Sequence, residues 1–175
     1  MLDKHSGFVV VVEGCDRTGK TTFCDFLSKL LGWPIVKFSQ PKGDAMAEYA
    51  EALRAHPESF IADRLHLGES VYGPIYRGTT PVPDDRFYAF EAELAARGAL
   101  LVLMTDTPER VIKRFEVHGE DFAKGDHVRA ILEAFDFQFV RSALPKVRMN
   151  METGTQLEKV TTVAGLARFT WEAQR

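Results

Sequence analysis

The sequence predicts a three-layer α/β domain in which helices cover both faces of a five-stranded parallel sheet. Two segments, 8–12 and 99–104, are continuous apolar runs, as expected of strands that are buried on both faces of a parallel sheet. Segments with helical spacing of apolar residues alternate with the strand segments along the chain. A length of 175 residues fits one domain, so we treat 1–175 as a single unit.

The first half of the chain contains three predicted strands. Segment 8–12 leads through a glycine-rich turn into a helix whose apolar residues recur at i, i+3, i+4, i+7 and i+8. A short strand at 35–38 precedes a helix with apolar residues spaced over 46–53. The strand at 60–64 ends in charged residues, and the glycines and proline of 66–78 predict a broken helix or a loop.

The second half repeats the alternation of helices and strands. Thr107 is predicted to cap a helix that has Pro108 in its first turn, and Thr155 with Glu158 forms a capping box at the start of the last helix. Segment 118–127 is polar, contains two glycines and is predicted to be a mobile flap. The other predicted elements are a helix over 87–94 after a proline-rich spacer, the strand at 99–104, a helix over 128–139 and a strand at 147–151.

Composition and charge exclude several classes of protein. Hydrophobic residues make up 45% and charged residues 27% of the chain, which is ordinary for a folded domain. The net charge of −3 gives no general attraction to nucleic acid or to an acidic membrane. The apolar run at 8–12 is too short to cross a membrane, so we expect no membrane partner. Cys15 and Cys24 are expected to be free thiols, which suits a cytoplasmic protein.

One motif carries the chemistry. The pattern G-x-x-x-x-G-K-[ST], which binds nucleotide phosphates, is matched between the first strand and the first helix by Gly14, Cys15, Asp16, Arg17, Thr18, Gly19, Lys20 and Thr21. The glycines let backbone N–H groups turn toward phosphate oxygens, and the helix adds the positive end of its dipole. Lys20 is predicted to sit between the β- and γ-phosphates of ATP, and Thr21 to bind Mg²⁺.

Two residues inside the motif point to a transfer reaction. An acid at Asp16 would repel phosphate, so we expect it to face a hydroxyl group of a second substrate. Arg17 is expected to reach the transferring phosphoryl group as an internal arginine finger. The loop therefore predicts a kinase with two substrates.

Residues 12–22, VEGCDRTGKTT, resemble the phosphate loop of thymidylate kinases, in particular of those that carry the catalytic arginine within the loop. The resemblance implies a P-loop kinase fold with a short lid, ATP as phosphoryl donor and Mg²⁺ as cofactor. It extends to Asp63 and Arg64, which match the family's Asp-Arg pair after the third strand. It implies that Asp16 contacts the 3′-hydroxyl, that Arg64 grips the acceptor's phosphate, and that Asp63 lies near Mg²⁺. The catalytic residues it implies are Lys20, Arg17, Asp63 and Arg64.

The same resemblance suggests the acceptor site and the lid. Segment 63–78 is similar to a stretch of bacteriophage and actinobacterial thymidylate-kinase-like proteins, which implies a viral or divergent bacterial member, in the host cytoplasm if viral. The lid corresponds to 113–127, with Arg114 and Lys124, and Thr22 and Arg114 join the ATP contacts. The backbone of 151–154 would contact adenine, and the family suggests a possible homodimer. The acceptor candidates are Asp16, Lys37, Phe38, Arg64, His66, Glu69, Tyr72, Tyr76 and Arg77.

Three functions are compatible with these residues. The first is phosphoryl transfer from MgATP to a deoxynucleoside monophosphate, dTMP before the others. The second keeps the donor but uses a hydroxyl acceptor, either a deoxynucleoside or a hydroxymethylpyrimidine in phage DNA; Asp63 or Glu69 would then act as base, and DNA would be a partner only in this case. The third is a nucleotide-dependent switch or slow ATPase, although the Asn-Lys-x-Asp run of guanine-specific switches is absent from the sequence.

Overall fold

The computed structural model describes residues 7–38, 40–79, 82–119, 125–150, 152 and 154–172. It contains a sheet of five parallel strands in the order β2-β3-β1-β4-β5. The strands are β1 (Val9–Glu13), β2 (Ile35–Lys37), β3 (Phe60–Asp63), β4 (Leu100–Thr105) and β5 (Lys146–Asn150). The predicted α/β fold class and all five predicted strands are therefore confirmed.

The helices follow the predicted alternation. They are α1 (Lys20–Leu31), α2 (Ala45–Ala55), α3 (His66–Tyr72), α4 (Asp84–Ala96), α5 (Pro108–His118), α6 (Val128–Arg141) and α7 (Gln156–Glu172). The broken helix predicted over 66–78 is α3 followed directly by a π-helical turn, η1 (Gly73–Arg77). The capping box of α7 is present, because Thr155 N–H donates to Glu158 and Glu158 N–H donates to the Thr155 hydroxyl. Thr107 stands at the N-cap of α5, but its side chain makes no capping hydrogen bond.

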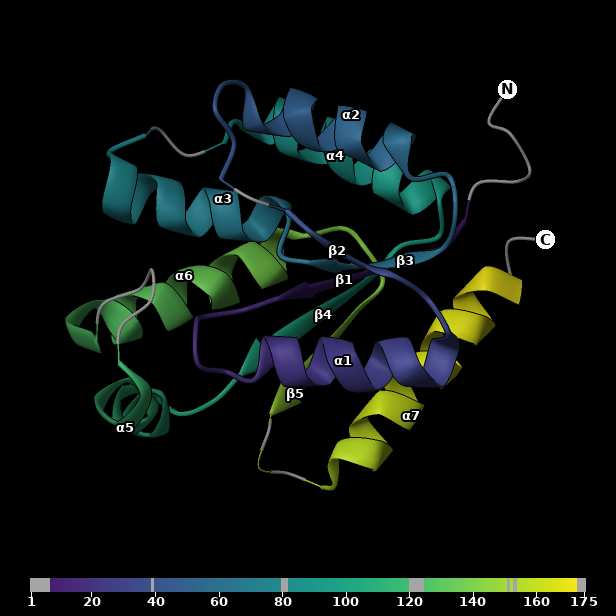
Figure 1. Ribbon diagram of the computed structural model, residues 1–175. Coiled ribbons are helices and arrows are strands. Elements are labelled where there is room, and N and C mark those ends of the chain that lie inside the picture. The colour runs from purple at the N-terminus through teal and green to yellow at the C-terminus, as the bar shows by residue number, and fades with distance from the viewer. Residues whose placement is uncertain are drawn as a thin grey trace.

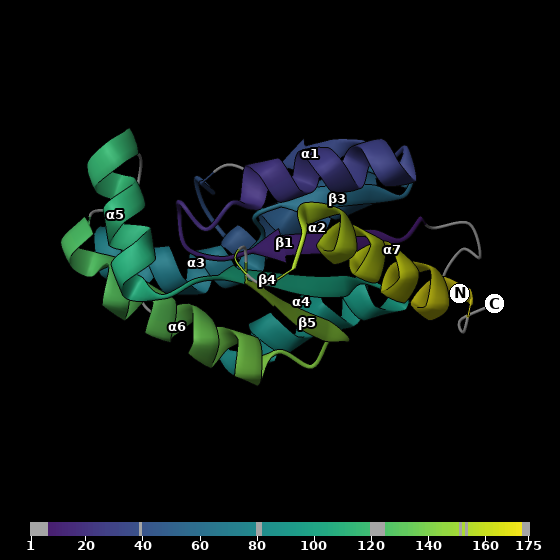
Figure 2. The same cartoon turned by 90° about the horizontal axis from the view of Figure 1, so that it is seen from below.

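The helices cover the sheet on both faces. Helices α1 and α7 lie on one face, and α2, α3, α4 and α6 lie on the other (Figures 1 and 2). Strand β1 is fully buried, so its side chains alternate between two cores: Val9 and Val11 pack toward α2 and α4, whereas Val10 and Val12 pack toward α1 and α7. Among the described residues, no helix is both long enough and apolar enough to span a bilayer.

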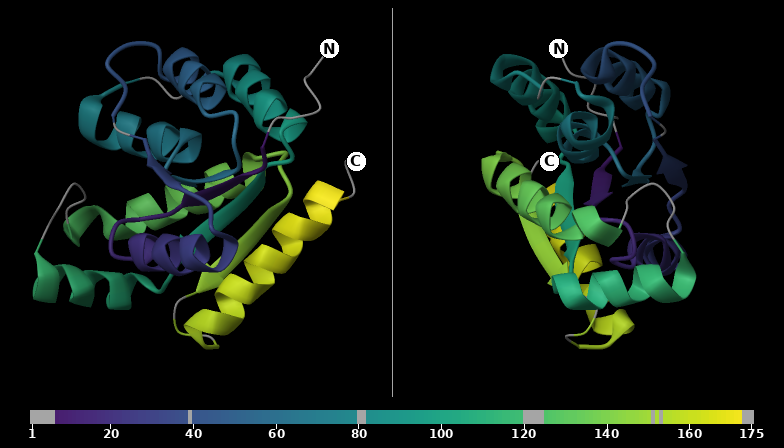
Figure 3. Two further views of the ribbon diagram at one scale, coloured as in Figure 1. Left: turned by 45° about the vertical axis from the view of Figure 1, so that its right-hand side comes forward. Right: turned by 90° about the vertical axis from the view of Figure 1, so that its left-hand side faces the viewer.

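The carboxyl ends of the strands mark the functional edge of the sheet. The loop after β1, the start of α1, α3 and α5 all lie toward this edge (Figures 1 and 3). Parallel α/β sheets bind ligands at that edge. The segment predicted as a lid begins inside a regular helix, since 113–118 belong to α5, and a short 3₁₀ helix, η2 (Gly125–His127), ends it. Lys124 lies outside the described residues.

Candidate active site

The phosphate loop takes its shape from two glycines. Gly14 has a φ of 141°, and a Cβ there would lie 2.1 Å from the carbonyl oxygen of Met104 in β4, so the loop passes the sheet too closely for any side chain. Gly19 has a φ of 87° and stands at the N-cap of α1, which begins at Lys20. The loop therefore turns directly into a helix N-terminus, the arrangement that binds phosphate groups.

The hollow beside the loop is strongly cationic, although the whole chain is acidic. It is lined by Asp16, Arg17, Gly19, Lys20, Thr21, Thr22, Arg64, Arg114 and His118. The Lys20 ammonium donates to the carbonyl oxygens of Gly14 at 2.8 Å and Cys15 at 2.7 Å, and lies 3.4 Å from Asp16 Oδ1. Four lysine and arginine side chains around one carboxylate give the hollow a charge that suits a polyphosphate.

Arg64 is held at the mouth of this hollow by Asp16. Its Nη2 donates to Asp16 Oδ1 at 2.7 Å, and Asp16 is buried whereas 43% of the Arg64 side chain is exposed. The backbone N–H of Arg64 donates to Val12 O, which ties the end of β3 to the end of β1 beside the phosphate loop. Asp16 thus orients the guanidinium predicted to grip the acceptor.

Arg17 connects the phosphate loop to the end of α5. Its Nη2 donates to the carbonyl oxygens of His118 at 3.0 Å and Gly119 at 2.9 Å, and its guanidinium lies over the ring of Phe115. In the described part of the chain, Arg17 and Arg64 are the two non-glycine residues with positive φ, at 66° and 70°. Such backbone conformations are disfavoured for side-chain-bearing residues and cluster at functional sites.

A second buried carboxylate positions Arg114, and sequence reasoning missed it. Asp106 Oδ2 accepts from Arg114 Nη2 at 2.6 Å, while Arg114 Nη1 donates to the carbonyl oxygen of Arg17 at 3.0 Å. Glu152, after β5, pairs with Arg110 and lies 3.8 Å from Arg114. The position of Asp106 in the sequence was the available signal, because it is the first acid after the apolar strand β4. Glu13, the last residue of β1, has a similar position.

Glu13 is a further residue that sequence reasoning missed. Its Oε1 accepts the backbone N–H groups of Leu65, Leu67 and Gly68 at 2.9, 3.0 and 3.2 Å. Burial raises the pKa of the Glu13 carboxyl, and the neighbouring His66, these N–H groups and Lys20 oppose the rise. Glu13 therefore anchors the start of α3 to the strand that precedes the phosphate loop.

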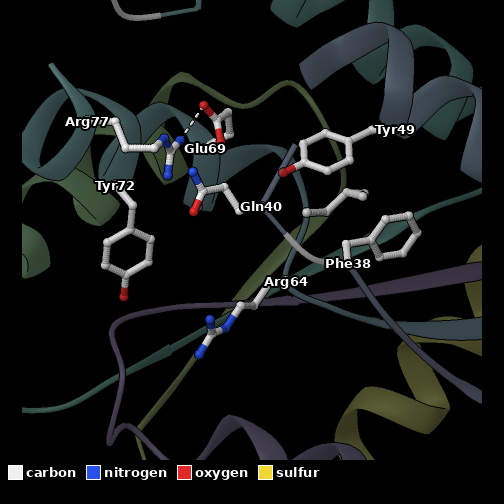
Figure 4. A pocket seen from close by; sticks show the side chains of 9 residues that line it. Phe38, Gln40, Tyr49, Arg64, Glu69, Tyr72 and Arg77 are labelled. Atoms are coloured by element: carbon white, nitrogen blue, oxygen red, sulfur yellow. Dashed lines mark ion pairs between the residues drawn. The ribbon is translucent and has the colours of Figure 1, made fainter. Parts of the chain in front are cut away.

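A second pocket lies on the other side of Arg64. It is lined by Phe38, Gln40, Tyr49, Arg64, Leu65, Gly68, Glu69, Tyr72 and Arg77 (Figure 4). Arg64 lines both this pocket and the cationic hollow, so the two sites meet at its guanidinium. Tyr72 also joins them, because its hydroxyl accepts the backbone N–H of Asp16 at 3.2 Å. Gln40 and Tyr49 were not predicted as acceptor contacts, because neither residue belongs to a motif that can be recognised in the sequence.

Of the acceptor candidates, the structure brings Asp16, Phe38, Arg64, Glu69, Tyr72 and Arg77 to this region and places three residues elsewhere. The prediction for His66 is wrong: its ring is fully buried against Phe87 and Phe90, and its Nε2 lies 3.0 Å from Glu91 Oε1. Lys37 is exposed and absent from the pocket lining, because side chains alternate along β2 and Phe38 takes the pocket side. Tyr76 packs between Tyr72 and His127 and does not line the pocket.

The residues predicted to hold Mg²⁺ have the chemistry that this ion requires. Thr21 is exposed in the cationic hollow beside Lys20, and Asp63 is the buried last residue of β3, directly before Arg64. Hydroxyl and carboxylate oxygens are the hard ligands that Mg²⁺ prefers, with water and phosphate oxygens completing its shell. When bound, the ion would neutralise charge on the transferring phosphoryl group.

No family model matches the sequence. The SPβ prophage-derived uncharacterized protein YorR of Bacillus subtilis (strain 168) is 26% identical over 132 residues, covering 73% of this chain and 79% of YorR. A crystal structure of YorR in complex with phosphorylated GDP superposes with a TM-score of 0.80 at 20% identity, covering 95% of this chain and 98% of that one.

Two further solved structures share the architecture. Deoxyadenosine kinase from M. mycoides has a TM-score of 0.62 at 13% identity, covering 90% of this chain and 97% of that chain. A gluconokinase from Sinorhizobium meliloti 1021 has a TM-score of 0.62 at 17% identity, covering 98% of each chain. Together with the phosphate loop between β1 and α1, these similarities show that this chain has the fold of the P-loop kinases.

Proposed function

We propose that this protein transfers a phosphoryl group from MgATP to a deoxynucleoside monophosphate, with dTMP as the preferred acceptor. The observation that carries the proposal is the place of Arg64, whose guanidinium lines both the cationic hollow and the second pocket. A planar guanidinium suits a phosphate group, and here it stands where a donor phosphoryl group and an acceptor would meet.

The donor side of the reaction follows from the cationic hollow. Lys20, Arg17 and Arg114 line this hollow and would contact a triphosphate bound there, and the N-terminus of α1 would add backbone N–H groups. Arg17 would turn from the carbonyl oxygens of His118 and Gly119 to the transferring phosphoryl group, which is a stronger acceptor because it is charged. Thr21 and Asp63 would hold Mg²⁺. Positioning and charge neutralisation supply the catalysis, because a phosphate oxygen of the acceptor is already a charged nucleophile.

A hydroxyl acceptor is the second candidate, supported by the similarity in fold to a protein named deoxyadenosine kinase. That reaction needs a carboxylate base close to Arg64. Of the two carboxylates predicted as base, Glu69 pairs with Arg77 at the other end of the second pocket (Figure 4), which favours Asp63. The phosphorylated GDP bound to YorR supports nucleotide binding by this fold and leaves the acceptor open.

The test is ADP release from MgATP with a panel of acceptors. The panel contains dTMP, dUMP, 5-hydroxymethyl-dUMP, dCMP, dGMP, dAMP, thymidine and DNA with hydroxymethyluracil. We expect dTMP to stimulate release most strongly, with the diphosphate as product. Stimulation by thymidine or modified DNA alone would replace the proposal by the hydroxyl-acceptor reaction. A rate independent of every acceptor would instead indicate an ATPase or switch.

Replacing Arg64 by alanine is expected to damage acceptor binding and turnover together. The variant loses the guanidinium that faces both sites, so the KM for the monophosphate should rise and kcat should fall, with kcat/KM reduced about 100-fold or more. Steady-state kinetics with dTMP varied at saturating ATP measure both constants. A normal KM for dTMP would show that Arg64 does not hold the acceptor's phosphate.

Replacing Asp16 by asparagine distinguishes a role in acceptor binding from a role in the metal and donor site. If its carboxylate orients Arg64 and reads the acceptor, the variant should lose dTMP turnover by about tenfold or more, while slow ATP hydrolysis without acceptor changes little. The measurement compares the two rates on one preparation. Equal losses in both would place Asp16 in the metal and donor site instead.

A further inference from the structure

Three polar side chains, Gln40, Glu69 and Arg77, lie at one end of the second pocket. Arg77 Nη2 forms an ion pair with Glu69 Oε1 at 2.5 Å, but the contact lacks hydrogen-bond geometry, so within the described residues this buried nitrogen has no hydrogen-bond partner. The ion pair engages one of the two carboxylate oxygens of Glu69. Gln40 lies beside the pair in the pocket (Figure 4). Buried polar groups without partners indicate a ligand site.

The local backbone is built to form this ion pair. Glu69 lies in α3 and Arg77 ends the π-helical turn that follows it. A π turn shifts the residues beyond it around the helix axis, and such turns occur frequently at functional sites. Gly73, at the junction, has no side chain to obstruct the pair, because a Cβ there would lie 3.1 Å from both Arg77 Nη2 and Glu69 Oε1. The same Cβ would lie 2.4 Å from Thr79 Oγ1.

The pair and Arg64 stand at opposite ends of the pocket. In Figure 4, Arg64 lies at one end, the Glu69–Arg77 pair lies at the other, and the rings of Phe38 and Tyr72 flank the space between them. A nucleoside monophosphate whose phosphate contacts Arg64 would lie along this space with its base at the pair. Aromatic walls suit the faces of a base, and the polar pair suits its edge.

We propose that Glu69 and Arg77 select the acceptor by the edge of its base, and that they favour a ring N–H flanked by carbonyl oxygens, as in thymine and uracil. The inference rests on the proposed nucleotide kinase function. The Glu69 carboxylate would accept the ring N–H, and the Arg77 guanidinium would donate to the carbonyl oxygen beside it. Cytosine and adenine present an amino group with two donors beside a bare ring nitrogen. Guanine shares the ring N–H beside a carbonyl oxygen and differs by its amino group and by the size of a purine, so dGMP is included in the comparison.

The experiment compares acceptor selectivity in matched variants. The kcat/KM values for dTMP, dUMP, dCMP and dGMP are measured for the wild type, Glu69→Gln, Gly73→Ala and the control Glu93→Gln. Glu93 forms an exposed ion pair with Arg54 outside the site, so its variant tests the loss of one surface charge. Calorimetric binding of dTMP and dCMP without ATP gives a second readout that does not depend on turnover.

We expect the dTMP to dCMP ratio of kcat/KM to fall by about tenfold or more in Glu69→Gln, because a site built to hydrogen-bond one edge discriminates strongly against others. Gly73→Ala keeps both side chains but displaces them, so the ratio should fall there too, while Glu93→Gln keeps the wild-type ratio. If the ion pair only stabilised α3, the kcat/KM values for all acceptors would fall equally in the variants. Unchanged ratios of kcat/KM in both variants would therefore overturn the inference.

The two proposals fail in distinguishable ways. If the wild type phosphorylates monophosphates with unchanged selectivity in the variants, the nucleotide kinase function stands and the role of the pair is refuted. If the wild type phosphorylates nucleosides and no monophosphate, the proposed function is refuted. The thymidine to deoxycytidine ratio in the same variants then decides the role of the pair.

Discussion

Replacing Lys20 by alanine is expected to lower kcat by about 100- to 1,000-fold, because the proposed function assigns this buried lysine to the transferring phosphoryl group. Lys20 is the first residue of α1, and its ammonium lies within 2.8 Å of the carbonyl oxygens of Gly14 and Cys15 in the phosphate loop. The measurement is ADP release under saturating MgATP and acceptor.

The matched control is Lys29→Ala, which removes a lysine from the exposed end of the same helix. Its side chain lies over the exposed ring of Phe26, away from the site, so kcat should stay within about twofold of the wild type. Thermal unfolding of both variants checks that they fold. A Lys20→Ala enzyme with more than a tenth of the wild-type kcat would contradict the role of the phosphate loop in transfer.

Of the variants described here, Glu91→Ala is expected to lose the most stability, about 2 to 4 kcal/mol in the free energy of unfolding. Glu91 is 2% exposed, and its two oxygens meet His66 Nε2 at 3.0 Å and the backbone N–H of Ala143 at 2.7 Å. Its removal leaves a fully buried imidazole and a partly buried backbone N–H without an acceptor. Chemical denaturation of the variant measures the loss.

Glu93→Ala on the same helix is the control for Glu91→Ala. Glu93 is 45% exposed and pairs with an arginine that is 65% exposed, so its removal should change the free energy of unfolding by less than about 0.5 kcal/mol. Similar losses in the two variants would show that the His66–Glu91 contact contributes no more to stability than a surface pair.

The effect of Glu91 should also depend on pH. Burial raises the pKa of its carboxyl, but hydrogen bonds from His66, Ser142 and Ala143 outweigh burial and hold it below the usual value near 4.5. A carboxyl whose pKa is depressed by folding stabilises the protein above its unfolded-state pKa and loses that contribution as the pH falls. The difference in stability between the wild type and Glu91→Ala should therefore shrink as the pH falls below about 4.5.

The sequence by itself determined the features that depend on neighbouring residues. The phosphate loop is contiguous, so the spacing of Gly14, Gly19 and Lys20 was sufficient to predict a helix N-terminus that faces phosphate. Apolar runs and helical spacing of apolar residues identified the strands and helices, and the glycines and proline of 66–78 indicated the broken helix. The capping box of α7 spans three residues and could be read in the same way.

The tertiary structure decided which residues share the site, because those contacts join distant segments. Asp16 and Arg64 are 48 positions apart, and Arg64 reaches the loop because β3 pairs with β1. Charge and residue type indicated His66 as a ligand contact, but the phase of a seven-residue helix against the sheet is set by packing, which turned it into the core. In the same way, the π turn set the position of Arg77 beside Glu69, a rotation that no sequence period encodes.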